Sequence, residues 1–298
     1  MEVQLDNPRP VDHLVLPTAD LEVARARLAS LGFTVAPEAR HPFGTANACV
    51  FFSDGTYLEP VAIAQRELCE HAALGGNTFV KHDQAYRFRR GEEGISALVM
   101  RTENAEEDRR QFVKSGISAG LNLEFSRPFE TPDGERVMAG FELAFAADLR
   151  APDVFFFTCQ RRNPAAVDRS ALESHENGVT GIRQVVLSEQ NPSDFQYLLQ
   201  HVVQQRTVNA HSFGLDLAAS NADIAALNAA GLEGFFGVKG GTHARGLRLR
   251  GLVFVVNDLH AMEQRLKDAG VAFAFVSGRL VVPEAAGQGA FFAFEQSD

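Results

Sequence analysis

The sequence predicts an α+β protein built from four copies of one unit, in which a strand, a helix and three further strands follow one another (βαβββ). The main observation is internal similarity. Residues 11–33, 95–117, 181–203 and 249–271 each read as an apolar strand, a polar turn and an amphipathic helix. Strand-like runs follow these helices. Repetition on this scale indicates one supersecondary unit used several times.

The first unit shows why each element is expected. Apolar residues recur at helical spacing in its second segment, at Leu21, Ala24, Leu28 and Leu31. Asp20 is a suitable N-cap, and Gly32 is a suitable stop. Strand-like runs follow at 33–40, 45–53 and 56–64, and the turn Asp54-Gly55 joins the last two.

The later units repeat this order with one irregularity. The second unit ends in the strand-like run 152–160, and the fourth continues with runs at 271–278, 279–285 and 289–296. In the third unit, 211–220 reads as a strand, but 221–241 reads as helical or irregular, which leaves that unit open to a distorted form. Residues 66–94 read as a connection between the first two units.

A polar linker divides the four units two and two. Residues 161–181 are rich in polar side chains and contain Pro164, Asn177 and Gly178. We therefore expect one half at residues 1–162 and a second half at residues 179–298, each with two units.

Composition excludes several classes of partner. The net charge of −10 argues against nucleic acid and against anionic membrane surfaces. No apolar run approaches the roughly 20 residues that span a bilayer, and no secretory signal is visible. Three cysteines without a C-x-x-C pair indicate reduced thiols and a cytoplasmic protein. A homodimer is compatible with the sequence.

The sequence also resembles a known superfamily. Four βαβββ units, with His13 in the first strand and Glu59 in "YLE" of the fourth strand, are similar to the vicinal oxygen chelate superfamily. More narrowly, "GTANACVFFSDGTYLEPVA", "FFFTCQRRNP" and "HENGVTGI" resemble its glyoxalase-like domain proteins. The resemblance implies two halves of the glyoxalase/dihydroxybiphenyl-dioxygenase type, each an open curled mixed sheet around a cleft.

The resemblance also implies a divalent metal, held by the first and fourth strands of two paired units. Only the first unit has both ligands, His13 and Glu59. In the second unit, Ala97 and Phe157 occupy these positions. In the second half, Gly251 and Ala293 occupy them in the fourth unit, and Gln184 occupies the first position in the third unit. Because alanine and phenylalanine have no donor atoms, no pair of units supplies four ligands.

We therefore predict a small-molecule-binding protein with a degenerate metal site and an apolar cleft, and we expect no resident cofactor. The ligand is a small apolar or aromatic molecule, because phenylalanine replaces a charged side chain in the cleft. Its predicted site is the catalytic pair His13 and Glu59 with Phe51, Phe155, Phe157, Gln160, Gln184 and His211. The alternative is a metal-dependent lyase, isomerase or ring-cleaving dioxygenase in which His13 and Glu59 hold a divalent metal.

Overall fold

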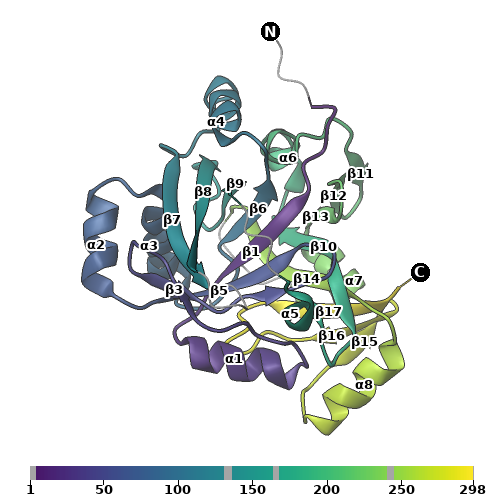
Figure 1. Cartoon of the computed structure of the whole chain (residues 1–298). Helices are drawn as coiled ribbons and strands as arrows, with labels where there is room; N and C mark the ends of the chain where they lie inside the picture. Colours follow the sequence, from purple (N-terminus) through teal and green to yellow (C-terminus); the bar gives the residue numbers. More distant parts are fainter. Residues whose placement is uncertain (1–4, 131–135, 164–167, 240–244, 298) are drawn as a thin grey trace.

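A computed structural model describes residues 5–130, 136–163, 168–239 and 245–297. Figure 1 shows two curled sheets with helices packed around and between them. In the part of the chain that is described, no helix is long and apolar enough to cross a lipid bilayer.

The first half contains the first two repeated units and a helical insertion between them. Its elements in chain order are β1 (Val11–Pro17), α1 (Leu21–Ser30), β2 (Ala39–Arg40), β3 (Thr45–Asn47), β4 (Val50–Phe51), β5 (Tyr57–Ile63), α2 (Arg66–Leu74), α3 (Thr78–Arg90), β6 (Ala97–Arg101), α4 (Ala105–Lys114), β7 (Leu123–Glu130), β8 (Arg136–Ala146) and β9 (Phe155–Arg162). The strands form one sheet in the order β2-β3-β5-β1-β6-β9-β8-β7, with β4 beside β5.

The second half repeats the plan after the short helix α5 (Ser170–Glu173). Its elements are β10 (Val179–Ser188), the 3-10 turn η1 (Pro192–Phe195), α6 (Gln196–Val203), β11 (Asn209–His211), β12 (Gly214–Ala218), β13 (Asp223–Leu227), α7 (Ala229–Phe236), β14 (Arg248–Val256), α8 (Leu259–Asp268), β15 (Ala274–Val276), β16 (Arg279–Val282) and β17 (Phe291–Gln296). Their order in the sheet is β11-β12-β13-β10-β14-β17-β16-β15.

The helices of the first and last units begin and end as the repeat predicts. Asp20 caps α1 by accepting a hydrogen bond from the backbone N–H of Glu22 at 2.7 Å, and Asp258 caps α8 through the N–H of Ala261 at 2.9 Å. Each helix stops before a glycine with positive φ, Gly32 at +85° and Gly270 at +65°. An aspartate cap and a terminal glycine therefore define the two ends of both helices in the same way.

One apolar core joins the two halves. It takes residues from β1 and β6 of the first sheet, from β10, β14 and β17 of the second, and from α1, α4, α6 and α8. Phe33, just after α1, contacts the rings of Phe254 and Phe292 at 5.4 and 6.3 Å between centroids. Polar contacts add to the connection, since Arg9 donates to the carbonyls of His201 and Val202.

Three sequence-based expectations need correction. The third unit is not distorted in residues 221–239, because β13 completes its set of strands and α7 follows; residues 240 and 241 lie outside the described part. The run 33–40 shortens to the two residues of β2, since Arg25 donates to the carbonyls of Val35 and Ala36 and Pro37 has no N–H to give. Residues 66–94 hold two helices, α2 and α3.

The predicted linker 161–181 lies only partly in the described residues, because 164–167 fall outside them. The part of the linker around His175 is hydrogen-bonded to the first half. The Nδ1 of His175 accepts a hydrogen bond from the backbone N–H of Thr34 at 3.0 Å, and its Nε2 donates to the carbonyl of Phe51 at 2.9 Å. His175 therefore serves to attach this segment.

Candidate functional site

The strand register places the candidate residues on one face of the first sheet. β1 and β6 are antiparallel neighbours in its centre, and each pairs in parallel with the last strand of its own unit, β5 or β9. His13 lies opposite Val99, and Val15 lies opposite Ala97, so a local two-fold relation exchanges the positions of His13 and Ala97. The same relation exchanges Glu59, beside Val15, with Phe157, beside Val99.

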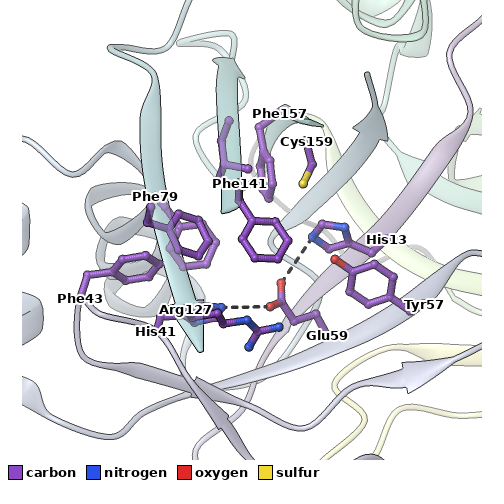
Figure 2. Close-up of a pocket in the computed structure, with 12 residues that line it drawn as sticks. His13, His41, Phe43, Tyr57, Glu59, Phe79, Arg127, Phe141, Phe157 and Cys159 are labelled. Carbon is purple, nitrogen blue, oxygen red and sulfur yellow. Dashed lines mark ion pairs between the residues drawn. The ribbon is translucent and has the colours of Figure 1, made fainter. Parts of the chain in front are cut away.

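His13 and Glu59 lie next to each other at the bottom of a buried pocket (Figure 2). The Nε2 of His13 is 3.4 Å from Oε2 of Glu59, well within the distance of about 6 Å over which charges couple strongly. The two residues are only 3% and 7% exposed. A stacked ring covers the histidine on one side, because the centroid of Tyr57 lies 4.3 Å away.

Asp12 lies behind the histidine and orients it. The Nδ1 of His13 donates to Oδ2 of Asp12 at 2.8 Å. Asp12 is fully buried and also binds two arginines, Arg101 at 3.0 Å and Arg161 at 2.7 Å. The imidazole is therefore fixed between two carboxylates, one on each ring nitrogen.

These contacts decide the charges in the pair. Burial alone would lower the pKa of His13, but hydrogen bonds and charges from Asp12 and Glu59 outweigh it and raise that pKa. For Glu59, burial opposes ionisation, yet the hydrogen bond and charge of His13 lower its pKa to about 2. The pKa of Asp12 is also lowered to about 2 for the same reasons. The contacts therefore favour the charged form of both partners, an imidazolium beside a carboxylate.

A second histidine lies on the other side of Glu59. The Nε2 of His41 is 3.6 Å from Oε1 of Glu59, and its Nδ1 lies 2.9 Å from the hydroxyl of Thr45. Burial lowers the pKa of His41 to about 4, and the charge of Arg127 adds to this effect. Asn47 donates to Oε1 of Glu59 at 2.6 Å. Glu59 thus has the imidazole of His13 on one oxygen, with its charged form favoured, and the neutral imidazole of His41 and the amide of Asn47 near the other.

The walls of this inner cavity are mostly aromatic. It has a volume of about 40 Å³, enough for a few small atoms, and rings from several elements surround it. They belong to Phe43, Phe79 of α3, Phe125 of β7, Phe141 of β8 and Phe157 of β9. Cys159 also lines it, and burial raises the pKa of that thiol, so it is not an activated nucleophile.

A larger outer cavity of about 340 Å³ adjoins the inner one. Tyr57, Arg127 and Phe141 line both, so the two cavities are adjacent and share part of their walls. Phe51 lines the outer cavity, together with a group of arginines. The inner end is therefore aromatic with one ion pair, and the outer part is basic.

The structure brings some of the predicted residues together and not others. Phe157 lines the inner cavity and contacts His13 edge-on at 5.7 Å between ring centroids. Phe155 is buried on the same face, 5.9 Å from Phe157, where it stacks on His82 at 4.8 Å. Phe51 lies in the outer cavity.

The placement of the three polar candidates needs correction. The side chain of Gln160 accepts a hydrogen bond from the N–H of Ala105 at 3.1 Å, at the start of α4. Gln184 lies on β10 of the second sheet, opposite Val253. His211 lies on edge strand β11 and pairs with Asp216 at 3.2 Å. None of the three lines the inner or outer cavity, because a polar side chain in a strand run does not reveal which sheet or face it joins.

Sequence reasoning missed much of the site. Its additional residues are Asp12, His41, Phe43, Asn47, Tyr57, Phe79, Arg101, Phe125, Arg127, Phe141, Leu143, Arg161, Arg162 and Arg169. The sequence gave a weak signal for two of them. Asp12 is the neighbour of His13, and Tyr57 lies two positions before Glu59, on the same face of the strand. His41 lies in a loop, and Phe79 lies in a helix of the insertion, where no strand alternation points to the cleft.

The residues present do not fit the four-ligand metal site that the superfamily implies. His13 and Glu59 carry donor atoms, but the positions related to them by the two-fold hold Ala97 and Phe157. The ring of Phe157 also occupies the side of His13 from which such ligands would approach. Among the residues that the structure describes, no group of three or more His, Cys, Asp or Glu side chains is arranged to hold a metal.

The equivalent face of the second sheet is filled by its own side chains. Gly251 pairs with Phe291 on β17, and a Cβ on Gly251 would meet the Phe291 ring at 2.5 Å. Leu232 and Phe236 of α7 pack onto the same cluster. The ring of Phe291 therefore takes the space in front of Gly251, which corresponds in the register to Ala97 of the first half, as Gln184 corresponds to His13.

The paired βαβββ units and the strand positions of His13 and Glu59 define a member of the vicinal oxygen chelate superfamily. Residues 11–203 match the family model described as a glyoxalase-like domain, and the chain belongs to that family. No curated protein matches the sequence.

Solved structures share the fold at low sequence identity. A hypothetical protein from Staphylococcus aureus is 12% identical with a TM-score of 0.65, over 97% of this chain and 99% of that one. A mutant of 4-hydroxymandelate synthase from Streptomyces coelicolor is 13% identical with a TM-score of 0.59, over 97% and 93%. A Mn(II)-bound glyoxalase from Novosphingobium aromaticivorans is 11% identical with a TM-score of 0.56, over 97% and 82%. These likenesses concern the fold alone.

Proposed function

We propose that this protein binds a small apolar or aromatic molecule in the first half without a resident metal, with His13 and Glu59 at the polar end of the ligand. The observation that carries the proposal is the strand register, which puts Ala97 and Phe157 at the positions where paired units would supply the other metal ligands. The aromatic wall of the inner cavity supports an apolar ligand.

The ion pair would hydrogen-bond the polar end of the ligand. Glu59 is an acceptor with a low pKa, and His13 is a donor whose charged form is favoured because Asp12 and Glu59 raise its pKa. A ligand hydroxyl can donate to Glu59, and a ligand oxygen can accept from His13. Because the inner cavity is only about 40 Å³, a small end of the ligand enters it and the remainder lies in the outer cavity.

The second candidate is a metal-dependent lyase, isomerase or ring-cleaving dioxygenase. One observation favours it, because the carboxylate of Glu59 lies within 3.4 Å of His13 and 3.6 Å of His41, and imidazole and carboxylate are common metal ligands. The structure of the Mn(II)-bound glyoxalase shares this fold. A divalent metal would need to replace the contacts that Glu59 makes in the present arrangement.

Metal analysis separates the two candidates. Protein purified without chelator is analysed for Zn, Fe, Mn and Ni beside a His13→Ala variant. The binding proposal expects no stoichiometric metal in either. Near-stoichiometric metal that is lost in the variant would overturn it and support the enzyme.

Ligand binding tests the proposal directly. We expect the neutral aromatic probe 4-phenylbutyramide to bind, as measured by ligand-observed NMR, and Leu143→Phe to weaken binding by filling the inner cavity that Leu143 lines. Gln184→Ala, at the equivalent of His13 in the second half, is the matched control and should leave binding unchanged. Binding that is insensitive to Leu143→Phe would contradict the assignment of the site.

The proposal also covers the cellular compartment of the protein and its partners other than the small molecule. Cys49, Cys69 and Cys159 are free and buried, which supports a reducing compartment such as the cytoplasm. We also propose that nucleic acid and membranes are not partners, on the basis of the net charge of −10. A homodimer is compatible with this function.

A further inference from the structure

The outer cavity is basic in a protein that is acidic as a whole. The chain carries a net charge of −10. Yet five arginines line this one cavity, and among its described lining residues Glu173 is the single carboxylate. The arginines are Arg101, Arg127, Arg161, Arg162 and Arg169. They come from three strands and the segment before α5, so the fold gathers them from distant parts of the sequence.

Internal ion pairs offset only part of this charge. Asp12 is shared by three cations, because Arg101, Arg161 and the imidazolium of His13 all contact it. One buried carboxylate is therefore shared by several groups that carry or favour a positive charge, whereas Arg162 pairs with two other carboxylates, those of Glu124 and Glu142. The hydrogen bonds from Arg161 to Asp12 use Nη2 alone, and Arg101 reaches Asp12 through Nε. The Nη2 of Arg101 also donates to the carbonyl of Gly55 at 2.8 Å, but a guanidinium has five N–H donors, so both arginines have donors beyond these contacts.

Arg127 connects the basic part of the site with its aromatic end. It lines both cavities, and Figure 2 shows it near Glu59 and Phe141. Its Nη1 donates to Oδ1 of Asn47 at 3.4 Å, and its guanidinium lies 5.7 Å from the centroid of Phe141. Among the described residues, no carboxylate lies within ion-pair distance of Arg127. A partly buried arginine without a carboxylate partner among the described residues is suited to bind an anionic ligand.

We propose that the outer cavity recognises an anionic group, a carboxylate or a phosphate, so that the ligand is an aryl- or alkyl-substituted organic acid whose uncharged end enters the inner cavity beside His13 and Glu59. This rests on the proposed binding function and adds the charge of the ligand to it. Arg127 binds the anion where the two cavities meet, and Arg101 and Arg161 provide further donors. The shared residues Tyr57 and Phe141 line the passage between the two ends of the ligand.

A matched set of probes tests the charge. Isothermal titration calorimetry at low salt compares 4-phenylbutyrate with the neutral 4-phenylbutyramide, and 3-phenylpropyl phosphate serves as the phosphate arm. We expect at least one anion to bind about tenfold or more tightly than the amide, because charge-assisted hydrogen bonds are roughly twice as strong as neutral ones. The tighter of the two anions assigns the group, and added salt should reduce the advantage.

Variants locate the effect. Arg127→Gln should weaken binding of the anion far more than binding of the amide and so remove most of the advantage of the anion, since the charge-assisted contact is lost. Arg110→Gln makes the same change of charge on the exposed side of α4, where Arg110 pairs with Glu107, and should leave the preference intact.

The outcomes separate this inference from the function on which it rests. Equal binding of the anions and the amide by the wild-type protein overturns the anion site and leaves the binding function standing. An anion preference that Arg127→Gln leaves unchanged also overturns it. If none of the three probes binds, both proposals are wrong. The wild-type comparison decides the matter even where Arg127→Gln does not fold.

Discussion

At the scale of single residues, the site depends on a buried imidazole held between two carboxylates. An ion pair taken out of water is stable only when its remaining donors and acceptors are satisfied. Here Asp12 binds two arginines, and Glu59 accepts from Asn47. Removing one member leaves a buried charge without its partner, so it changes the charge state of its neighbours and lowers stability.

Glu59→Gln should leave the fold nearly intact and lower the pKa of His13. The amide keeps the size of the side chain and an oxygen for Asn47, but one of the two carboxylates that raise this pKa is lost. We expect a stability loss of about 1.5–3 kcal/mol, the range for a hydrogen bond to a charged group. An NMR titration of the His13 ring measures the pKa. The exposed Glu38→Gln is the control, and an unchanged pKa in Glu59→Gln would contradict the assigned pairing.

His41 should make the protein less stable as pH falls from about 6.5 to about 4. Its pKa is lowered to about 4 in the folded protein from 6.5, chiefly by burial, so between these values the unfolded chain binds a proton that the folded one does not. The loss from this residue is about 3 kcal/mol at pH 4. His13 does not contribute to the change in stability between pH 4 and 6.5, because its raised pKa affects stability only above about pH 6.5.

Urea unfolding between pH 4 and 7 measures this effect. His41→Gln should flatten the dependence, and the exposed His260→Gln should not. Part of the slope will remain in His41→Gln, since burial also lowers the pKa of His82, His175 and His201. Below about pH 4.5 the curve should fall further, as Glu59 and Asp12, both with a lowered pKa of about 2, take up protons only on unfolding. Identical slopes for wild type and His41→Gln would contradict the prediction.

At the scale of elements, the repeated helices depend on local capping, while the additional helices depend on burial. α1 and α8 share an aspartate cap and a terminal glycine, which the repeat alone predicts. In contrast, α3 packs Phe79 and Val80 onto the first sheet, and α7 packs Leu232 and Phe236 onto the second. These two helices close the concave faces, and neither belongs to the repeated unit.

Asp20→Ala and Asp258→Ala should each destabilise the protein by about 1 kcal/mol, the usual cost of losing an N-cap hydrogen bond. Similar values are expected because both aspartates accept from the backbone of the first helical turn. Unfolding in urea measures the change. Replacement by asparagine should retain most of the stability, since asparagine caps as well as aspartate does. A loss of the same size in the asparagine variants would show that charge, and not capping, is the cause.

At the scale of the whole molecule, the two sheets are united by a common core. The ring of Phe33 from the first half packs against Phe254, Phe292 and Phe294 of the second, at 5.4 to 6.3 Å between centroids. Large apolar contact between halves favours their joint unfolding. Among the described residues, the first sheet holds the cavity with His13 and Glu59, whereas Phe291, Leu232 and Phe236 pack against the corresponding part of the second sheet.

The wild-type protein should therefore unfold in one calorimetric transition, and Phe33→Ala should shift that single transition downward. The expected cost is about 3–5 kcal/mol, typical of deleting a buried aromatic ring. Differential scanning calorimetry provides the measurement, and the exposed Phe88→Ala is the control. Two separate transitions, or an effect of Phe33→Ala on only one of them, would contradict a shared core.

The sequence alone determined the repeated plan and the inner pair of the site. Apolar periodicity, caps and turn residues act locally, so the strand and helix starts of all four units can be predicted from them. The alignment of the units also gave the positions of His13, Glu59, Ala97 and Phe157, because equivalent residues of a repeat occupy equivalent places in the sheet.

Only the tertiary structure decided what surrounds that pair. His41 reaches Glu59 from a loop, Phe79 enters from an inserted helix, and Arg127 and Arg161 come together from separate strands. It also decided that Gln160, Gln184 and His211 lie elsewhere. The physical reason is that local patterns fix the conformation of a segment, whereas a pocket is made by long-range packing, which brings together residues that share no spacing in the sequence.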